Sequence, residues 1–133
     1  MPLLVGPEPD LPIETADQCL EIARPLQSPY LGLNFDIGHF YCVKDDPADT
    51  VRKLAPLIQH VHLEDIAATR VHHHLVPGEG VIDFRGTLAA LKEVGYAGWV
   101  TIELYTYHEN PDEAAKTARE RVLGYATDVG VTL

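Results

Sequence analysis

At 133 residues and 46% hydrophobic composition, the chain is long enough to form one domain with a core of its own. Twenty acidic residues against ten basic ones give a formal net charge of −10. A surface this acidic repels phosphate backbones and anionic lipids, so we expect neither nucleic acid nor membrane as a partner.

The cysteines and the lengths of the apolar runs indicate in which cellular compartment the protein is expected. Cys19 and Cys42 match no zinc-binding or redox spacing, so we expect free thiols in a reducing cytosol, with a disulfide as the alternative. The first residues lack the basic segment of a signal peptide, and no apolar run is long enough to cross a bilayer. These features predict a cytoplasmic protein.

Short apolar runs alternate with helical patterns along the chain. In chain order the expected elements are a strand at 3–5, a helix at 15–26, a strand at 30–35, a helix at 46–55, a strand at 57–63, a helix at 83–94, a strand at 99–102 and a helix at 110–125. Strands that are apolar nearly throughout, alternating with amphipathic helices, are typical of a parallel sheet covered by helices.

Polar side chains follow each expected strand. In folds with parallel sheets, the residues that perform chemistry lie at the carboxyl ends of the strands. The residues at these ends are Gly6 and Glu8, Asp36 and His39, His62 and Asp65, and Glu103. The third strand also alternates His60, His62 and Glu64 on one face, a pattern more typical of a divalent-metal site than of a packed core.

Four segments together resemble the carboxyl-terminal half of a xylose isomerase-like TIM barrel. They are Asn34-Phe35-Asp36-Ile37-Gly38-His39, His60-Val61-His62-Leu63-Glu64-Asp65, the run Pro-Gly-Glu-Gly-Val-Ile-Asp-Phe from Pro77, and residues 95–103. The resemblance covers residues 3–123 and implies an α/β fold, a partial (β/α)8 barrel of about four parallel strand–helix units, with residues 1–133 as a single domain.

The resemblance also implies a site. The family holds a divalent metal by a Glu, an Asp, a His and a second Glu, and Asp36, His62 and Glu103 occupy the last three places. Glu103 is then also the catalytic carboxylate that removes a proton from the sugar. His39, Arg70 and His74 lie where the family contacts substrate.

The first metal-binding place departs from the family pattern. The expected glutamate falls on Gly6, and Glu8 two residues later replaces it only if the loop bends back. Glu8 is therefore the candidate for the second catalytic carboxylate. Mixed oxygen and imidazole ligands without thiolate fit Mn²⁺, Zn²⁺, Mg²⁺ or Co²⁺.

The expected function is a metal-dependent isomerase or epimerase of a sugar, sugar phosphate or related polyol, acting by proton abstraction next to a polarised carbonyl. A complete barrel needs eight strands, so the alternative is a non-catalytic half-barrel that forms a homodimer or associates with a missing amino-terminal half. An endonuclease IV-like phosphodiesterase shares the barrel, but the acidic charge argues against it.

Several residues also have plainer interpretations. Asp36 could cap a turn before Gly38, and Asp65 could either orient a metal-bound histidine or cap its loop. Of His72-His73-His74, we expect one, His74, to face the substrate and the other two to face solvent. The loop at Pro77 could hold a phosphate by its backbone amides or form an ordinary turn.

Overall fold

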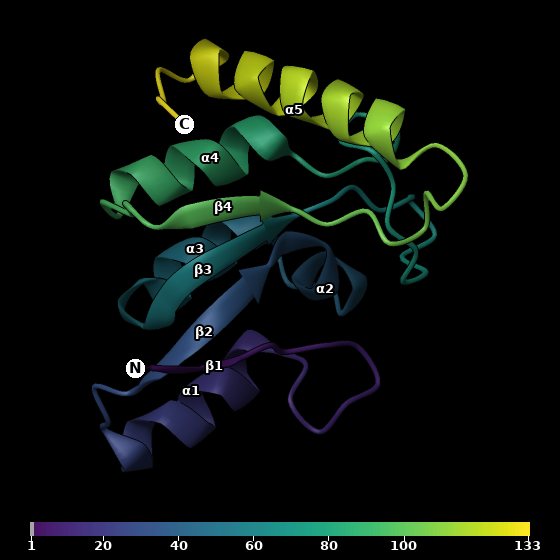
Figure 1. Cartoon of the computed structure of the whole chain (residues 1–133). Coiled ribbons are helices and arrows are strands. Elements are labelled where there is room, and N and C mark those ends of the chain that lie inside the picture. The colour runs from purple at the N-terminus through teal and green to yellow at the C-terminus, as the bar shows by residue number, and fades with distance from the viewer. Residues whose placement is uncertain (1) are drawn as a thin grey trace.

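A single parallel sheet organises the computed structural model, which describes residues 2–133 (Figure 1). Its strands lie in the order β1–β2–β3–β4, so that each strand pairs with the next one along the chain. The strands are β1 (Leu3–Val5), β2 (Leu31–Asp36), β3 (Ile58–Leu63) and β4 (Trp99–Ile102). The predicted partial barrel of four parallel strand–helix units is confirmed.

Helices follow every strand, at nearly the predicted positions. They are α1 (Ala16–Leu26), α2 (Ile37–Cys42), α3 (Pro47–Leu54) with a 3₁₀ turn η1 (Ala55–Leu57), α4 (Phe84–Glu93) and α5 (Pro111–Asp128). The predicted starts at Thr15 and Asp46 are confirmed, because both side chains cap their helices. Asn110 precedes α5 but makes no side-chain capping bond. The short helix α2 was not predicted.

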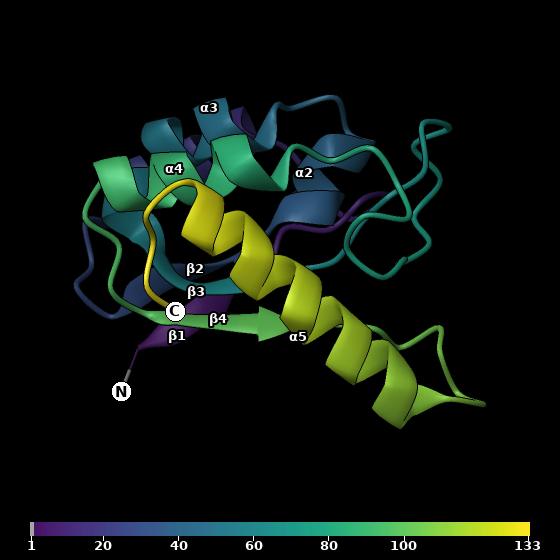
Figure 2. The same ribbon diagram turned by 90° about the horizontal axis from the view of Figure 1, so that it is seen from above.

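One face of the sheet packs against the helices. Phe35, Val61 and Leu63 point toward them and are fully buried, as are Phe40 and Leu54 on the helices themselves. Figure 2 shows α2, α3 and α4 on this side of the sheet, while α5 runs past β4 at its edge. The opposite side, here called the open face, carries Asn34, Asp36, His60, His62, Trp99 and Thr101, which the strand pairing places on the same side.

The two outer strands each pair on one side only, so the sheet is open at β1 and β4. Leu3 on β1 is 71% exposed and Trp99 on β4 is 82% exposed. Beside β4, an open groove of about 1370 Å³ runs to α5, and its walls include Leu91, Val122 and Leu133. An edge strand beside an apolar groove is a surface that another strand can pair with.

Two further predictions concern the cysteines and membranes. Cys19 and Cys42 are both free thiols, as predicted, and burial raises the pKa of each to about 11. Among residues 2–133, no helix combines the length and the apolar character needed to span a bilayer.

Candidate functional site

The carboxyl ends of β2, β3 and β4 bring Asp36, His62 and Glu103 together. Nδ1 of His62 lies 3.7 Å from Oδ2 of Asp36 and 3.5 Å from Oε2 of Glu103. The parallel pairing explains the first contact, because Asp36 is level with His62 in the sheet. Three side chains that are far apart in sequence therefore converge on one point, as predicted for the ends of parallel strands.

Asp36 has one engaged oxygen and one unengaged oxygen. Oδ1 accepts a hydrogen bond of 2.9 Å from the backbone N–H of His39 and so caps α2. Oδ2 is buried and has no hydrogen-bond partner among residues 2–133. Burial alone would raise the pKa of Asp36, but His62, Glu64 and His39 lower it below the usual value. A buried, ionised oxygen without a partner is suited to a cation.

The two histidines of β3 differ in their surroundings. The neighbouring carboxylate of Asp36 raises the pKa of His62, against the effect of its burial, and Glu103 acts in the same direction. Nε2 of His60 lies 2.9 Å from the hydroxyl of Thr101, and burial lowers the pKa of His60. His60 is thus a hydrogen-bonding partner within the sheet, while His62 faces the carboxylates.

Glu64 is an additional carboxyl group at this site, which the sequence placed on the polar face of the third strand with His60 and His62 but outside the expected ligand set. It is fully buried directly after β3, and its Oε1 accepts a hydrogen bond from the backbone N–H of Gly38. Burial, together with the negative charge of Asp36, raises the pKa of Glu64 well above its usual value. Oxygens of Asp36, Glu64 and Glu103 and a nitrogen of His74 all lie within 4.8 Å of one another.

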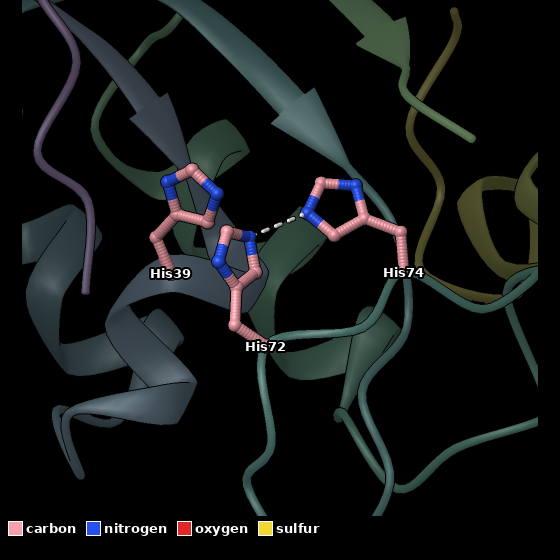
Figure 3. A group of neighbouring side chains, drawn as sticks. All are labelled: His39, His72 and His74. Carbon is pink, nitrogen blue, oxygen red and sulfur yellow. Dashed lines mark hydrogen bonds between the residues drawn. The ribbon is translucent and has the colours of Figure 1, made fainter. Parts of the chain in front are cut away.

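Three histidines form a second cluster beside these carboxylates (Figure 3). His39 belongs to α2, while His72 and His74 come from the loop between β3 and α4. The expectation that His72 faces solvent is wrong: its Nε2 lies 3.1 Å from Nε2 of His74, which is fully buried. His73 is exposed, as expected. The ring of Tyr105 lies over His74, with ring centroids 4.4 Å apart.

The loop after β1 reaches this cluster, but Gly6 offers no side chain to it. The backbone carbonyl of Pro7 lies 2.9 Å from Nδ1 of His39. Glu8 is close enough to affect His72, whose pKa is lowered by burial and by His39 but raised by the charge of Glu8. Space is free around Gly6, since a Cβ placed there would have nothing within 4 Å.

Arg70 lies against α2. Its guanidinium stacks on the ring of Tyr41 at 4.0 Å and donates a hydrogen bond to the backbone carbonyl of the same residue. These contacts do not bring Arg70 to the carboxylates, and its role in substrate binding stays a prediction.

Asp65 holds the loop that follows β3. Its two oxygens accept hydrogen bonds of 2.8–3.0 Å from the backbone N–H groups of Ile66, Gly78, Gly80 and Ile82. Asp65 therefore caps its loop, and none of its hydrogen bonds goes to a histidine. Because the amides of Gly78 and Gly80 already donate to this carboxylate, the segment forms an ordinary turn and not a phosphate-binding loop.

The residues present fit a divalent cation. Asp36, His62 and Glu103 supply carboxylate and imidazole ligands at one point, and no described residue makes a competing hydrogen bond to the buried Oδ2 of Asp36. Such a donor set is typical of Zn²⁺, Mn²⁺ and Co²⁺ sites. Glu64 and His74 are further candidate ligands, because they lie within the same cluster of ligand atoms.

Comparison with known proteins gives consistent results. The chain is 30% identical over 128 residues to an inosose dehydratase of Clostridium beijerinckii, covering 83% of this chain and 43% of that protein. An uncharacterised protein of Methanocaldococcus jannaschii is 41% identical over 92 residues, which make up 67% of this chain and 31% of the relative. The chain thus spans less than half the length of these curated relatives.

Two solved structures share the fold. A D-tagatose 3-epimerase-like protein superimposes with a TM-score of 0.83 at 32% identity, over 98% of this chain and 48% of that one. The IOLI protein, solved with a binding zinc atom, gives a TM-score of 0.82 at 23% identity, over 97% of this chain and 50% of that one. The family described as xylose isomerase-like TIM barrel matches residues 2–123, and the chain belongs to this family.

Proposed function

We propose that the protein is a metal-dependent isomerase or epimerase of a sugar, a sugar phosphate or a related polyol. In this proposal Asp36, His62 and Glu103 hold the metal, which is Mn²⁺, Zn²⁺, Mg²⁺ or Co²⁺. The observation that carries it is the convergence of these three side chains, with Nδ1 of His62 between the two carboxylates at 3.7 and 3.5 Å. The relatives are named for inosose and for tagatose, both polyhydroxylated carbonyl compounds, which supports this class of substrate.

The chemistry needs a base, an acid and an electrophile. When bound, the divalent ion supplies electrophilic polarisation of the carbonyl oxygen of the sugar. Glu103, which is about 39% exposed at its side chain and so accessible from the open face, removes the proton from the neighbouring carbon. Glu8, from the loop after β1, is the proposed carboxylate on the other side of the substrate.

Substrate binding is assigned to His39, His74 and Arg70. His39 and His74 face the carboxylate cluster, His39 with its Nε2 3.6 Å from Oδ2 of Asp36. Nδ1 of each ring donates to a backbone carbonyl, so Nε2 of either neutral imidazole can accept a hydrogen bond from a sugar hydroxyl. Arg70 reaches the substrate only if it leaves the ring of Tyr41. We expect the protein to act in the cytosol.

Metal content and proton exchange test the proposal. The apo protein is dialysed against Mn²⁺ or Zn²⁺, and Asp36→Ala and His62→Ala are expected to lose the ion, while the exposed His73→Ala keeps it. In D₂O, the wild type is expected to exchange a carbon-bound proton of ketoses and inososes, observed by NMR, and Glu103→Gln is expected to abolish this exchange. A chain that binds no metal in any form rules out the proposal.

The second candidate is a non-catalytic half-barrel that becomes complete only with a partner. The observation in favour is the pair of unpaired edges, with exposed Leu3 and Trp99 and an apolar groove beside β4. The partner is a second copy of the chain or an amino-terminal half of the same barrel. Metal binding without proton exchange, combined with a dimer in solution, favours this candidate. A compact, active monomer contradicts it.

A further inference from the structure

The sheet has two free edges that match one another. All four strands are parallel, and β1 and β4 each pair on one side only. Figure 1 shows these two strands at opposite margins of the sheet. Neither Leu3–Val5 nor Trp99–Ile102 contains a charged residue, although charged residues commonly protect free edges in native proteins. Both edges are therefore suited to pairing with a further parallel strand.

The backbone amides that are free to pair can be identified on each edge. The N–H of Leu3 donates to the carbonyl of Tyr30, on the side of β2, and the N–H of Glu103 donates to the carbonyl of Leu63, at the end of β3. Amide groups alternate in direction along a strand. The N–H groups of Leu4 in β1 and of Val100 in β4 therefore point away from the sheet, toward the free edges.

The apolar groove beside β4 fits the exposed side of β1. Val100 and Ile102 of β4 face the helices and line this groove. Val5 is level with the core residue Leu33, so Val5 and Leu3 also face the helix side of their own sheet. Leu3 is 71% exposed within a single chain. A second β1 that paired with β4 would place its Leu3 over the groove and bury apolar surface from both chains.

We propose that β4 of one chain pairs in parallel with β1 of a second copy, and that the reciprocal pairing closes an eight-stranded barrel. Four strands from each copy make up the eight strands of a closed parallel barrel. A two-fold rotation about the barrel axis forms both seams at once and leaves no free edge. The carboxyl end of β1 of the second copy, which is followed by Gly6 and Glu8, then lies beside Glu103. The second copy thus completes the mouth of the site.

This pairing assigns one occupant to the edge surface of the second candidate function, and it rests on no catalytic or metal-binding role. The open face of the sheet becomes the interior of the barrel, so that Trp99, which is 82% exposed in a single chain, is enclosed. His62 lies on the inner strand β3, away from both seams. His62→Ala is therefore expected to dimerise like wild type even where it loses the metal, which separates this inference from the proposed chemistry.

Mass and tryptophan fluorescence of the purified chain test the pairing. Light scattering is expected to give twice the chain mass of 14.7 kDa. Trp99 is the only tryptophan, so dilution to the monomer is expected to shift its emission to longer wavelength and to increase its quenching by acrylamide. A chain that stays monomeric at high concentration overturns the inference and leaves an amino-terminal half as the occupant. A dimer in which Trp99 is quenched as strongly as in the monomer overturns it too, because the contact then lies elsewhere.

Proline substitutions test the two seams. Proline is tolerated in an edge strand where its nitrogen faces outward, so Val100→Pro and Leu4→Pro are each expected to fold, as verified by circular dichroism. Each variant alone is expected to be monomeric, because both seams lose one edge. An equimolar mixture keeps one intact seam, between β1 of Val100→Pro and β4 of Leu4→Pro, and is expected to form a heterodimer. Val71→Ser is the control: Val71 is 63% exposed in the loop between β3 and α4, and the variant is expected to remain dimeric. A proline variant that dimerises as tightly as wild type overturns the inference.

Discussion

Glu64 accepts a hydrogen bond from the backbone N–H of Gly38, which ties the end of β3 to the first turn of α2. The contact leaves no room for a side chain at Gly38, because a Cβ there would run into the Glu64 carboxyl and approach Ile66 to 2.9 Å. Gly38 and Glu64 are therefore a matched pair. Together they hold α2, and with it His39, against the ends of the strands.

Gly38→Ala is expected to destabilise the protein by roughly 1–3 kcal/mol, the cost of forcing extra volume into a packed interior. Chemical denaturation monitored by circular dichroism measures the loss. Gly124→Ala is the matched control, because Gly124 lies within α5 and a Cβ there would meet nothing within 4 Å. Alanine at that position favours the helix and is expected to be neutral or slightly stabilising. Equal effects of the two substitutions would contradict the packing argument.

Glu64→Gln is expected to change the pH dependence of stability. The pKa of Glu64 is raised in the folded protein, chiefly by burial, so the folded state keeps a proton that the unfolded chain releases above about 4.5. Wild type therefore loses stability from this group as the pH rises from about 4.5 toward the raised pKa. Glutamine cannot ionise, so the variant escapes this loss while keeping an acceptor for Gly38.

Urea unfolding at pH 5 and pH 8 measures the difference. The free energy of unfolding of Glu64→Gln minus that of wild type is expected to become more positive as the pH rises. Asp36 acts in the opposite direction, because its pKa is lowered and its contribution is lost on acidification, but it is present in both proteins. Parallel pH profiles would show that Glu64 is ionised in the folded protein.

Asp65→Ala is expected to destabilise the protein by about 3 kcal/mol, because several backbone N–H groups lose their acceptor at once. The loop between β3 and α4 should also become more accessible to proteases, and limited proteolysis reads this directly. Glu79→Ala is the control: Glu79 lies in the same loop but is exposed, and its contacts with Tyr107 and Arg121 are worth less than about 1 kcal/mol. A stable, protease-resistant Asp65→Ala would contradict the proposed role of this carboxylate.

The sequence predicted the sheet well because each strand is a short apolar run and each longer helix has a clear start. It did not predict α2, which has six residues, includes Gly38 and is too short to show an apolar period. This helix starts directly after Asp36, and the sequence is consistent with two alternative roles for that residue, a cap or a metal ligand. The structure shows the cap through Oδ1, and within residues 2–133 nothing hydrogen-bonds to Oδ2, so one carboxylate is available for both roles.

The site was predicted less completely than the fold, because the positions of several of its residues depend on the conformation of loops. The expected strands placed Asp36, His62 and Glu103 among the polar residues at the carboxyl ends, and the family resemblance singled out these three as ligands. His72 lies against His74 in a loop whose course is set by contacts such as the isolated bridge between Leu75 and Asp65. Nothing in the order of residues 71–74 shows this pairing. The sequence did place Glu64 on the face of His60 and His62, but its burial depends on α2, which was not predicted.

Gly6→Glu is expected to strengthen metal binding at Asp36, His62 and Glu103. Gly6 follows β1 directly, its φ is outside the left-handed region, and the space around it is free, so the substitution costs little stability. A carboxylate there adds a ligand from the one strand end that lacks it, and Kd for Mn²⁺ is expected to fall roughly tenfold, the size typical of a change in the ligand environment.

Two variants serve as controls for Gly6→Glu. Gly6→Gln introduces a side chain of the same shape as glutamate but without the charge. Glu8→Gln shows whether Glu8 already acts as the metal ligand from this loop. If Glu8→Gln weakens Mn²⁺ binding and the double variant Glu8→Gln/Gly6→Glu binds as tightly as wild type, glutamate at position 6 can replace Glu8. If Gly6→Glu binds Mn²⁺ no more tightly than Gly6→Gln, the end of β1 does not reach the metal.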